Sequence, residues 1–208
     1  MRPVYVMRPA ERRDEPAIVG LVTDRINSLD PGPDDRRDLE DHRSRVQDLL
    51  VATEEERPLV WVLTEDTHLL GVVLLLPGIT ACGWSTEQQA EPALAVGAMF
   101  THPATRPERL GRLITWWAAD YAARHTSATW LRAQTPSERL MRYARDEVGC
   151  EVAGTAQHQG RDVHLLQSRA RRINNLHAFI ADSGGACEAS SPSRPERRDG
   201  LSPRTSSW

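Results

Sequence analysis

Basic residues and a glycine gather where an apolar segment gives way to a helical pattern. Residues 93–101 form a nearly continuous apolar run, and a helix is expected to begin after a short loop. The first N–H groups of a helix have no partner within it and carry partial positive charge, which suits a phosphate. Arg106, Arg109 and Arg112 add positive charge there, and Gly111 permits close backbone approach. The pattern predicts an anion site at the end of a buried strand.

The chain contains no lysine, so every basic side chain is arginine or histidine. This excludes Schiff-base chemistry on a lysine, the Walker A lysine and the kinase strand lysine. Cys82, Cys150 and Cys187 have no metal-like spacing, and their odd, sparse number fits a reducing compartment. No histidine pattern accompanies them, so we expect incidental thiols rather than nucleophiles.

The basic segment resembles the signature of the GNAT family of N-acetyltransferases, Arg/Gln-x-x-Gly-x-Gly/Ala. The corresponding run here is Arg106-Pro107-Glu108-Arg109-Leu110-Gly111. Residues 99–103, Met-Phe-Thr-His-Pro, are similar to the family's strand end before this signature. Residues 137–150 are similar to its Asn-x-x-Ala-x-x-Phe-Tyr…Gly-Phe segment. The likeness covers roughly residues 3–168, and the order of the expected elements agrees with it.

The resemblance implies acetyl-coenzyme A as donor and a small-molecule or peptide amine as acceptor, with direct attack in a ternary complex and no metal. Backbone amides of residues 106–111 would hold the pyrophosphate, and the edge of residues 98–100 would pair with pantetheine. A bulge would separate this strand from that of Trp130, and the thioester would lie in the gap. The implied cofactor-binding residues are Ala98, Met99, Phe100, Arg106, Arg109, Leu110, Gly111 and Arg112.

The signature departs from the family pattern at three positions. Arg109 stands where the family usually has its first glycine, Pro107 lacks an N–H, and Glu108 brings negative charge toward the phosphates. Thr105 and Glu108 also fit a capping box, which would satisfy the helix start internally. A purely structural role of this segment is therefore the alternative to coenzyme binding.

Two residues are catalytic candidates. The family's Phe-Tyr pair, whose tyrosine can protonate the leaving thiolate, reads Tyr143-Ala144 here, so Tyr143 lies one position away and a core tyrosine is the alternative. Glu91 precedes the central strand, where a general base would be useful, and a solvated loop acid is the alternative. His102 at the other end of that strand is expected to be a loop or capping residue.

The sequence says less about the amine that would accept the acetyl group. Six acids within residues 30–41 could attract a cationic amine, or could simply form a solvated helix start. Tryptophans could line an acceptor cleft, although Trp61 and Trp117 fit the core better. The tryptophans concerned are Trp61, Trp84, Trp116, Trp117 and Trp130.

Hydrophobic periodicity predicts an α/β domain with a mixed, mostly antiparallel sheet and helices on both sides, in the order β-α-α-β-β-β-α-β-α-β-β. Residues 77–92 are expected to be loop. Strands are expected at 4–7, 59–63, 69–76, 93–101, 129–133, 151–156 and 163–167, and helices around 10–26, 39–50, 108–125 and 137–148.

We expect the domain to span residues 1–168 and residues 169–208 to be a basic, mostly disordered tail, since apolar residues become sparse. A net charge of −3 argues against a nucleic-acid partner. No stretch resembles a signal peptide or reaches the roughly 20 apolar residues that span a bilayer, so a cytoplasmic enzyme without a membrane partner is expected. Alternatives are a non-catalytic acyl-CoA-sensing or protein-binding module, and a tRNA- or protein-directed acetyltransferase recruited by the arginine-rich tail. Monomer and homodimer both remain open.

Overall fold

The computed structural model describes residues 5–28, 44, 59–78, 83–104, 107–158 and 160–182. Most of the expected helix at 39–50, the acidic residues 30–41 and the segment 183–208 lie outside the described residues. So do the side chains of residues 59 and 107–109.

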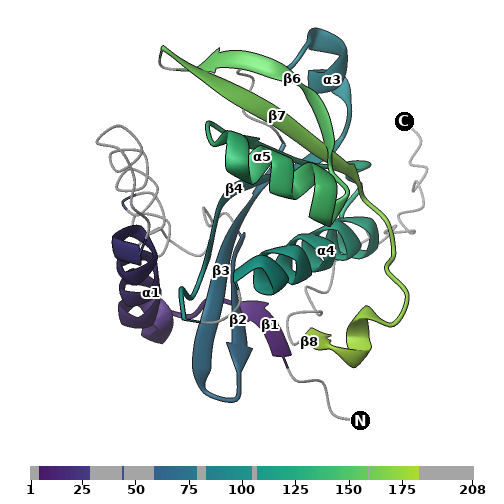
Figure 1. Ribbon diagram of the computed structural model, residues 1–208. Helices are drawn as coiled ribbons and strands as arrows, with labels where there is room; N and C mark the ends of the chain where they lie inside the picture. The colour runs from purple at the N-terminus through teal and green to yellow at the C-terminus, as the bar shows by residue number, and fades with distance from the viewer. Residues whose placement is uncertain are drawn as a thin grey trace, which may run out of the picture.

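An eight-stranded sheet forms the centre of the molecule, in the order β6-β7-β5-β4-β3-β2-β1-β8 (Figure 1). Neighbouring strands are antiparallel except in two pairs, β4–β5 and β1–β8. This confirms the mixed, mostly antiparallel sheet. The strands are β1 (Tyr5–Pro9), β2 (Leu59–Glu65), β3 (His68–Pro77), β4 (Ala93–Thr101), β5 (Trp130–Thr135), β6 (Glu151–His158), β7 (Arg161–Arg169) and β8 (Ile180–Asp182).

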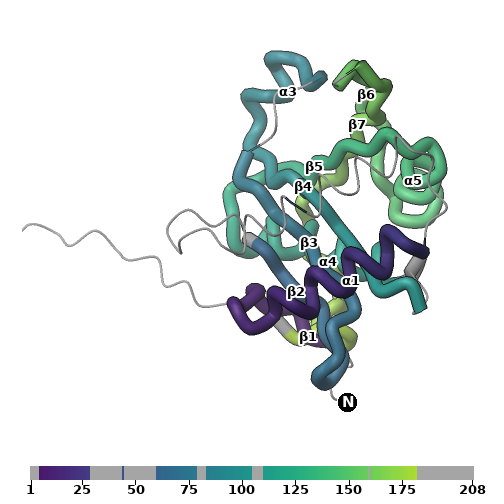
Figure 2. The backbone as a smooth tube through the Cα atoms, turned by 90° about the vertical axis from the view of Figure 1, so that its left-hand side faces the viewer, coloured from purple at the N-terminus to yellow at the C-terminus, as the bar shows by residue number. Residues whose placement is uncertain are grey.

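Helices cover both faces of the sheet (Figure 2). On one face α1 (Glu15–Ser28) packs on β3 and β4, and on the other α4 (Pro107–His125) packs on β3, β4 and β5. The short helix α5 (Glu138–Tyr143) continues into a π-helical turn, η2 (Ala144–Val148), beside α4. Three shorter elements are α3 (Thr86–Ala90), η1 (Arg12–Asp14) and η3 (Leu176–Ala178). No helix among the described residues is long and apolar enough to cross a membrane.

The two large core clusters follow from the sequence periods. Under α1, the i, i+3, i+4 positions Ile18, Leu21 and Val22 meet alternate residues of β2, β3 and β4. Under α4, Leu110, Ile114 and Trp117 meet the other face of the same strands. Trp61 and Trp117 are fully buried with ring centroids 4.7 Å apart, which confirms their expected place in the core.

Three boundaries differ from the expectation. The segment 77–92 contains α3, whose start is closed by a capping box between Ser85 and Gln88. The single helix expected at 137–148 is α5 followed by η2. The chain beyond residue 168 continues through η3 into β8, where Leu176 and Ile180 are buried and β8 pairs with β1. The fold therefore extends beyond residue 168, where we expected the domain to end. Leu176 and Ile180 are too few for a recognisable period, but they are enough to anchor a short edge strand.

The Arg8–Asp14 pair, which closes the turn before α1, makes the stability pH-dependent. The carboxylate of Asp14 accepts hydrogen bonds from Arg8 at 2.5 and 2.7 Å and from the Glu11 amide at 2.8 Å. The hydrogen bond from Arg8 lowers the pKa of Asp14 below its ordinary value. This stabilisation is present above the ordinary aspartate pKa and disappears as the pH falls through the lowered value.

Asp14→Asn is therefore expected to lower the free energy of unfolding at pH 7 by about 1–3 kcal/mol. The difference from wild type should shrink below about pH 4. Urea unfolding at pH 7, 5 and 3 measures both values. Asp24→Asn, on an exposed position of α1, is the matched control. An equal difference at pH 3 and pH 7 would contradict this prediction.

Candidate functional site

The parallel strands β4 and β5 part in the middle of the sheet. They pair only over residues 93–96 of β4, opposite residues 130–133 of β5. Beyond Val96, β4 continues to Thr101 on the side of β3, while β5 continues to Thr135 on the side of β7. We call this parting of the two strands the fork. Among the described residues, no strand pairs with β4 on its β5 side beyond Val96, as the sequence resemblance implied.

A bulge in β4 opens the fork. Leu74 of β3 lies opposite Ala98, but the next residue, Leu75, lies opposite Val96, so Gly97 is the extra residue. A β-carbon on Gly97 would lie 2.9 Å from Leu74 Cδ2, closer than packed carbon atoms allow. The expected bulge is therefore confirmed, and the close contact explains why glycine occupies this position.

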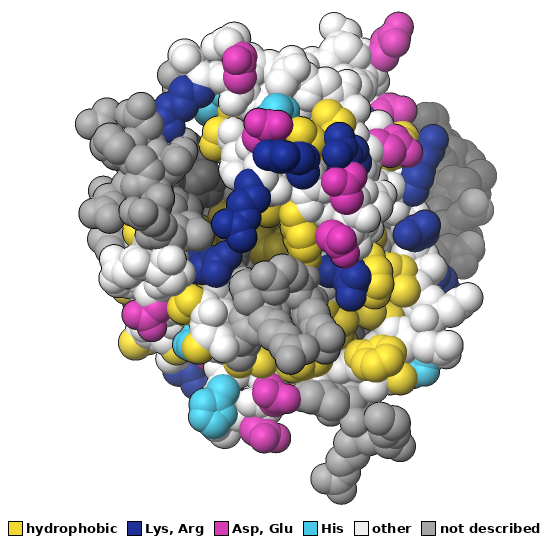
Figure 3. Space-filling model, in the orientation of Figure 1, with side chains coloured by type: hydrophobic (Ala, Val, Ile, Leu, Met, Phe, Trp, Pro, Cys, Tyr) yellow, Lys and Arg dark blue, Asp and Glu magenta, His cyan; other side chains and the backbone are white. Residues whose placement is uncertain are grey.

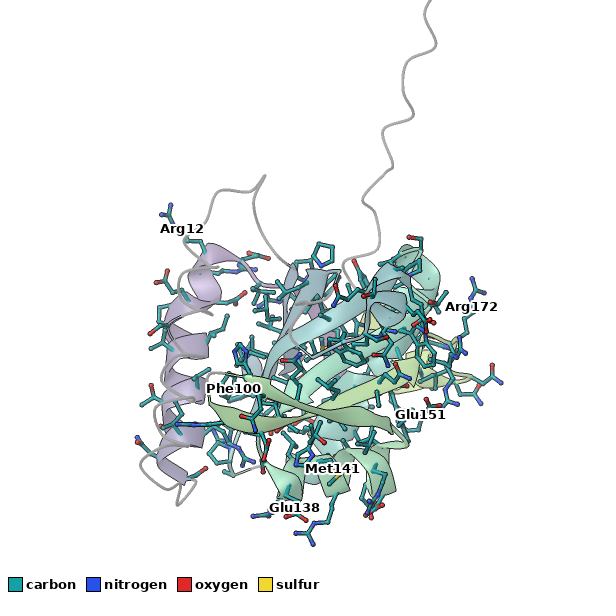
Figure 4. All side chains as sticks on the ribbon, turned by 90° about the horizontal axis from the view of Figure 1, so that it is seen from above. Arg12, Phe100, Glu138, Met141, Glu151 and Arg172 are labelled. Carbon is teal, nitrogen blue, oxygen red and sulfur yellow. The ribbon has the colours of Figure 1, made fainter. Side chains whose placement is uncertain are left out.

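The bulge also reverses which side chains of β4 face which helix. Leu94 packs under α4, whereas Ala98 and Phe100 pack under α1. Figure 4 shows Phe100 on the side of the sheet that α1 covers. Side chains alternate along a strand, so an even step would keep the same face without the extra residue. Ala98 and Phe100 are buried and Met99 packs on the α4 side. These three predicted residues can offer a ligand mainly their backbone edge.

The N-terminal end of α4 follows β4 directly. Leu110 is buried in the core under α4, so its side chain is not available to a ligand. Arg106 and the side chain of Arg109 lie outside the described residues, as does the capping box expected from Thr105 and Glu108. Nδ1 of His102 accepts a hydrogen bond from the Ala104 amide at 3.2 Å, which confirms the loop role expected for this histidine.

Arg112 lies one turn into α4 and is partly exposed. Its guanidinium lies 3.9 Å from a Glu147 carboxylate oxygen and 5.1 Å from the centroid of the Trp116 ring. Figure 3 shows a hollow with apolar side chains at its base, between α5 and α4, with basic side chains on one side and both acidic and basic side chains on the other. A partly exposed, cationic helix start beside a hollow is suited to an anionic ligand with an apolar portion.

Tyr143 points toward the start of α4 rather than into the sheet core. Its hydroxyl oxygen lies 3.6 Å from where a β-carbon on Gly111 would be, and the residue is half-buried. The next residue, Ala144, is buried, and its carbonyl accepts the Cys150 amide at 2.9 Å in the turn that ends η2. The structure therefore brings Tyr143 and Gly111 together and does not support the core alternative for this tyrosine.

Glu91 lies at the other end of β4, and its environment was not foreseen. Its carboxylate forms an ion pair with Arg132 of β5, whose side chain is 1% exposed. The Glu91 side chain is 44% exposed, so it is the partly solvated loop acid of the alternative, but one with an ion-pair partner, and it lies at the end of β4 away from α4. Sequence reasoning missed Arg132 because the apolar pattern around it indicated only a strand. An arginine within such a run was the signal that could have revealed it, since a buried arginine requires a partner.

Cys150 is the one cysteine among the described residues, and burial raises the pKa of its thiol to about 11. The thiol is therefore protonated near neutral pH and is a poor nucleophile. This agrees with the expectation of an incidental thiol.

The fold is that of the GNAT acetyltransferases. A GNAT-family acetyltransferase from Streptococcus agalactiae aligns with TM-score 0.62 and 16% identity, over 81% of this chain and 96% of that one. An aminoglycoside N(6')-acetyltransferase from Legionella pneumophila aligns with TM-score 0.58 and 9% identity, over 82% and 94%. A ribosomal-protein-S5-alanine acetyltransferase from Vibrio fischeri aligns with TM-score 0.57 and 12% identity, over 82% and 95%.

No protein-family model and no curated protein matches the sequence. At 9–16% identity these three alignments establish the fold and leave the chemistry to be argued from the site.

Proposed function

We propose that this chain is an N-acetyltransferase that moves the acetyl group of acetyl-coenzyme A to an amine. The observation that carries the proposal is the fork at Gly97 beside the start of α4. An unpaired strand edge can pair with the amides of pantetheine, and an adjoining helix start can bind the pyrophosphate. The two features lie in succession along one segment, as the two parts of coenzyme A require.

The chemistry follows from this placement. The amine nitrogen attacks the thioester carbonyl carbon, a C–N bond forms, the C–S bond breaks, and coenzyme A leaves as a thiolate. A strand amide at the fork would stabilise the oxyanion, and proximity would supply much of the remaining rate. The Tyr143 hydroxyl would protonate the thiolate, and the proton lost by the amine would pass through water to restore the hydroxyl. Arg106, Arg109 and Arg112 would balance the phosphate charge, with backbone contacts from Ala98, Met99, Phe100, Leu110 and Gly111.

A non-catalytic acyl-CoA-binding module is the second candidate. Ala144 at the position where the family often has its tyrosine, and Pro107 without an N–H, favour it. Both candidates bind the coenzyme, but only the enzyme turns it over. A tRNA- or protein-directed enzyme would instead lose activity on deletion of residues 183–208.

Titration calorimetry with acetyl-coenzyme A at low and moderate salt tests the proposal. Micromolar binding weakened by salt is expected, because part of the affinity comes from phosphate charge. Arg112→Glu should weaken binding about tenfold or more, since reversal replaces an attractive charge with a repulsive one. Arg13→Glu, at an exposed arginine of η1, is the matched control.

Two outcomes would count against the proposal, and a third would count against the role of Arg112. Absence of binding at millimolar ligand would reject an acetyl-coenzyme A site in this chain. Binding without turnover of any amine in a broad screen would favour the non-catalytic module. Equal weakening by the two charge reversals would remove Arg112 from the site, since a shared effect would reflect net charge alone.

A further inference from the structure

Arg132 carries a charge inside the molecule, on the face of β5 away from α4. One guanidinium nitrogen donates to the Gln88 carbonyl, and another pairs with the Glu91 carboxylate. The guanidinium carbon lies 4.7 Å from the ring centroid of Trp84 and 5.8 Å from that of Trp130. We call Arg132, Gln88 and Glu91, with the two flanking rings, the arginine clamp. It joins β5 to the segment that leads into β4.

Arg132 lies close to the fork, whereas its partners Gln88 and Glu91 precede β4, at the opposite end of the short ladder. Arg132 is opposite Ala95, and only the next pair, Val96 with Ala133, separates this level from the bulge at Gly97. The parallel ladder between the strands is four residues long, so few backbone bonds hold them together. The clamp adds a side-chain connection across the same two strands.

A buried charge makes this connection hard to release. An unpaired guanidinium in the interior is costly, so Arg132 keeps Glu91 and Gln88 in place. The segment that carries them is docked independently, because Trp84 packs on Val163 and Leu165 of β7. A β-carbon on Gly83 would overlap Ala156, at 2.1 Å, so the backbone approaches β6 closely there as well.

The place of Glu91 does not suit direct proton transfer at the fork. Gly97 comes four residues after Ala93, the first residue of β4, which corresponds to about 13 Å along the strand, and Glu91 lies further back still. A general base must come within about 3 Å of the proton it takes, directly or through one water. The contact with Arg132 gives Glu91 a different task, that of counter-ion to the buried guanidinium.

We propose that Arg132 is a positioning residue for acetyl transfer. Through Glu91 and Gln88 it holds β4 and β5 together up to Val96, so that the fork opens at Gly97 and at no earlier residue. The reactive carbonyl would then lie at a fixed place relative to the β4 edge. This inference rests on the proposed function for its catalytic consequence, but the arrangement of the strands can be measured without any ligand.

The test compares Arg132→Met with Arg124→Met. Arg124 pairs with the buried Asp120 at 2.6 Å on α4, away from the fork, so its replacement also removes an ion pair with a buried partner. In the ligand-free protein, hydrogen exchange of residues 93–96 and 130–133 should rise in Arg132→Met and stay near wild type in Arg124→Met. With acetyl-coenzyme A, kcat/KM should fall about tenfold or more in Arg132→Met only, as expected for a shifted reacting group. Arg132→Lys should recover part of the loss.

A second variant, Glu91→Gln, distinguishes a positioning role of Glu91 from a role as general base. It also replaces Arg132→Met in the test if that variant fails to fold. It should raise exchange at the same strands, lower kcat/KM to about the same extent as Arg132→Met, and leave the shape of the pH–kcat profile unchanged. A fall in kcat of about 100-fold with loss of the acidic limb would identify Glu91 as a base and overturn the proposal. So would unchanged exchange in both variants. If the wild type binds no acetyl-coenzyme A, the proposed function fails, and the exchange comparison still decides whether Arg132 holds the strands.

Discussion

Replacing Gly97 with valine is expected to reduce kcat/KM for acetyl-coenzyme A by about 100-fold or more, because small displacements of a reacting group cost this much. The branched side chain would be placed 2.9 Å from Leu74 Cδ2 and 3.0 Å from Leu76 Cδ1 at its first carbon alone. Both leucines lie in or against the core under α1. The overlap is relieved in part by the leucine side chains and in part by movement of β4 away from β3, which is toward the fork.

The same substitution should lower stability only moderately. Overpacking a core costs about 1–3 kcal/mol, and leucine side chains can partly give way. We expect the variant to fold, with a melting temperature lowered by several degrees. The edge of β4 at the fork should be closed or displaced. Calorimetric titration and thermal unfolding of the same sample measure the two effects separately.

Gly20→Val is the matched control for this change. A β-carbon on Gly20 in α1 would meet nothing within 4 Å, so valine there alters helix propensity but no packing. The control should bind acetyl-coenzyme A as the wild type does. Unchanged binding and turnover in Gly97→Val would show that the bulge does not position the thioester.

Tyr143→Phe is expected to lower kcat by about 100-fold while KM for acetyl-coenzyme A changes little. The hydroxyl faces Gly111 at the start of α4, and the substitution removes only this oxygen. If the hydroxyl protonates the departing thiolate, its loss acts in the transition state and not on binding. Steady-state kinetics across pH should also show the loss of the basic limb of the kcat profile.

Tyr121→Phe removes the same atom from another tyrosine near α4. The Tyr121 ring stacks with Trp117 at 5.1 Å, in the aromatic cluster of the core, and should tolerate the change with normal kcat. If Tyr143→Phe is as active as wild type, the thiolate of coenzyme A takes its proton from water and not from Tyr143. It would also leave proximity and the strand amide as the main sources of rate.

The sequence alone was sufficient for the elements whose side chains repeat with a clear period. The apolar run of β4 and the apolar face of α4 predicted a buried strand followed by a long helix, and both formed where expected. The likeness at residues 106–111 added the family fold and, with it, the bulge and the parting from the Trp130 strand. Local pattern and a known family together therefore determined the scaffold.

The sequence analysis did not predict two short elements, and there is a physical reason for this. Helix α3 spans five residues and β8 three, too few for a period to appear. Each is held by tertiary contacts instead, α3 by the arginine clamp and β8 by pairing with β1. In segments this short, intrinsic helix or strand propensity is a weak signal, and packing against the rest of the protein decides whether the element forms.

Only the tertiary structure determined what the polar residues do. Glu91 and Arg132 are 41 residues apart, and their pairing depends on β4 and β5 lying side by side. The direction of Tyr143 depends on the crossing of α5 over Gly111, which no spacing along the chain encodes. Strand and helix formation are set largely by local periodicity, whereas the partner of a buried charge or the neighbour of a hydroxyl is set by which distant segments meet.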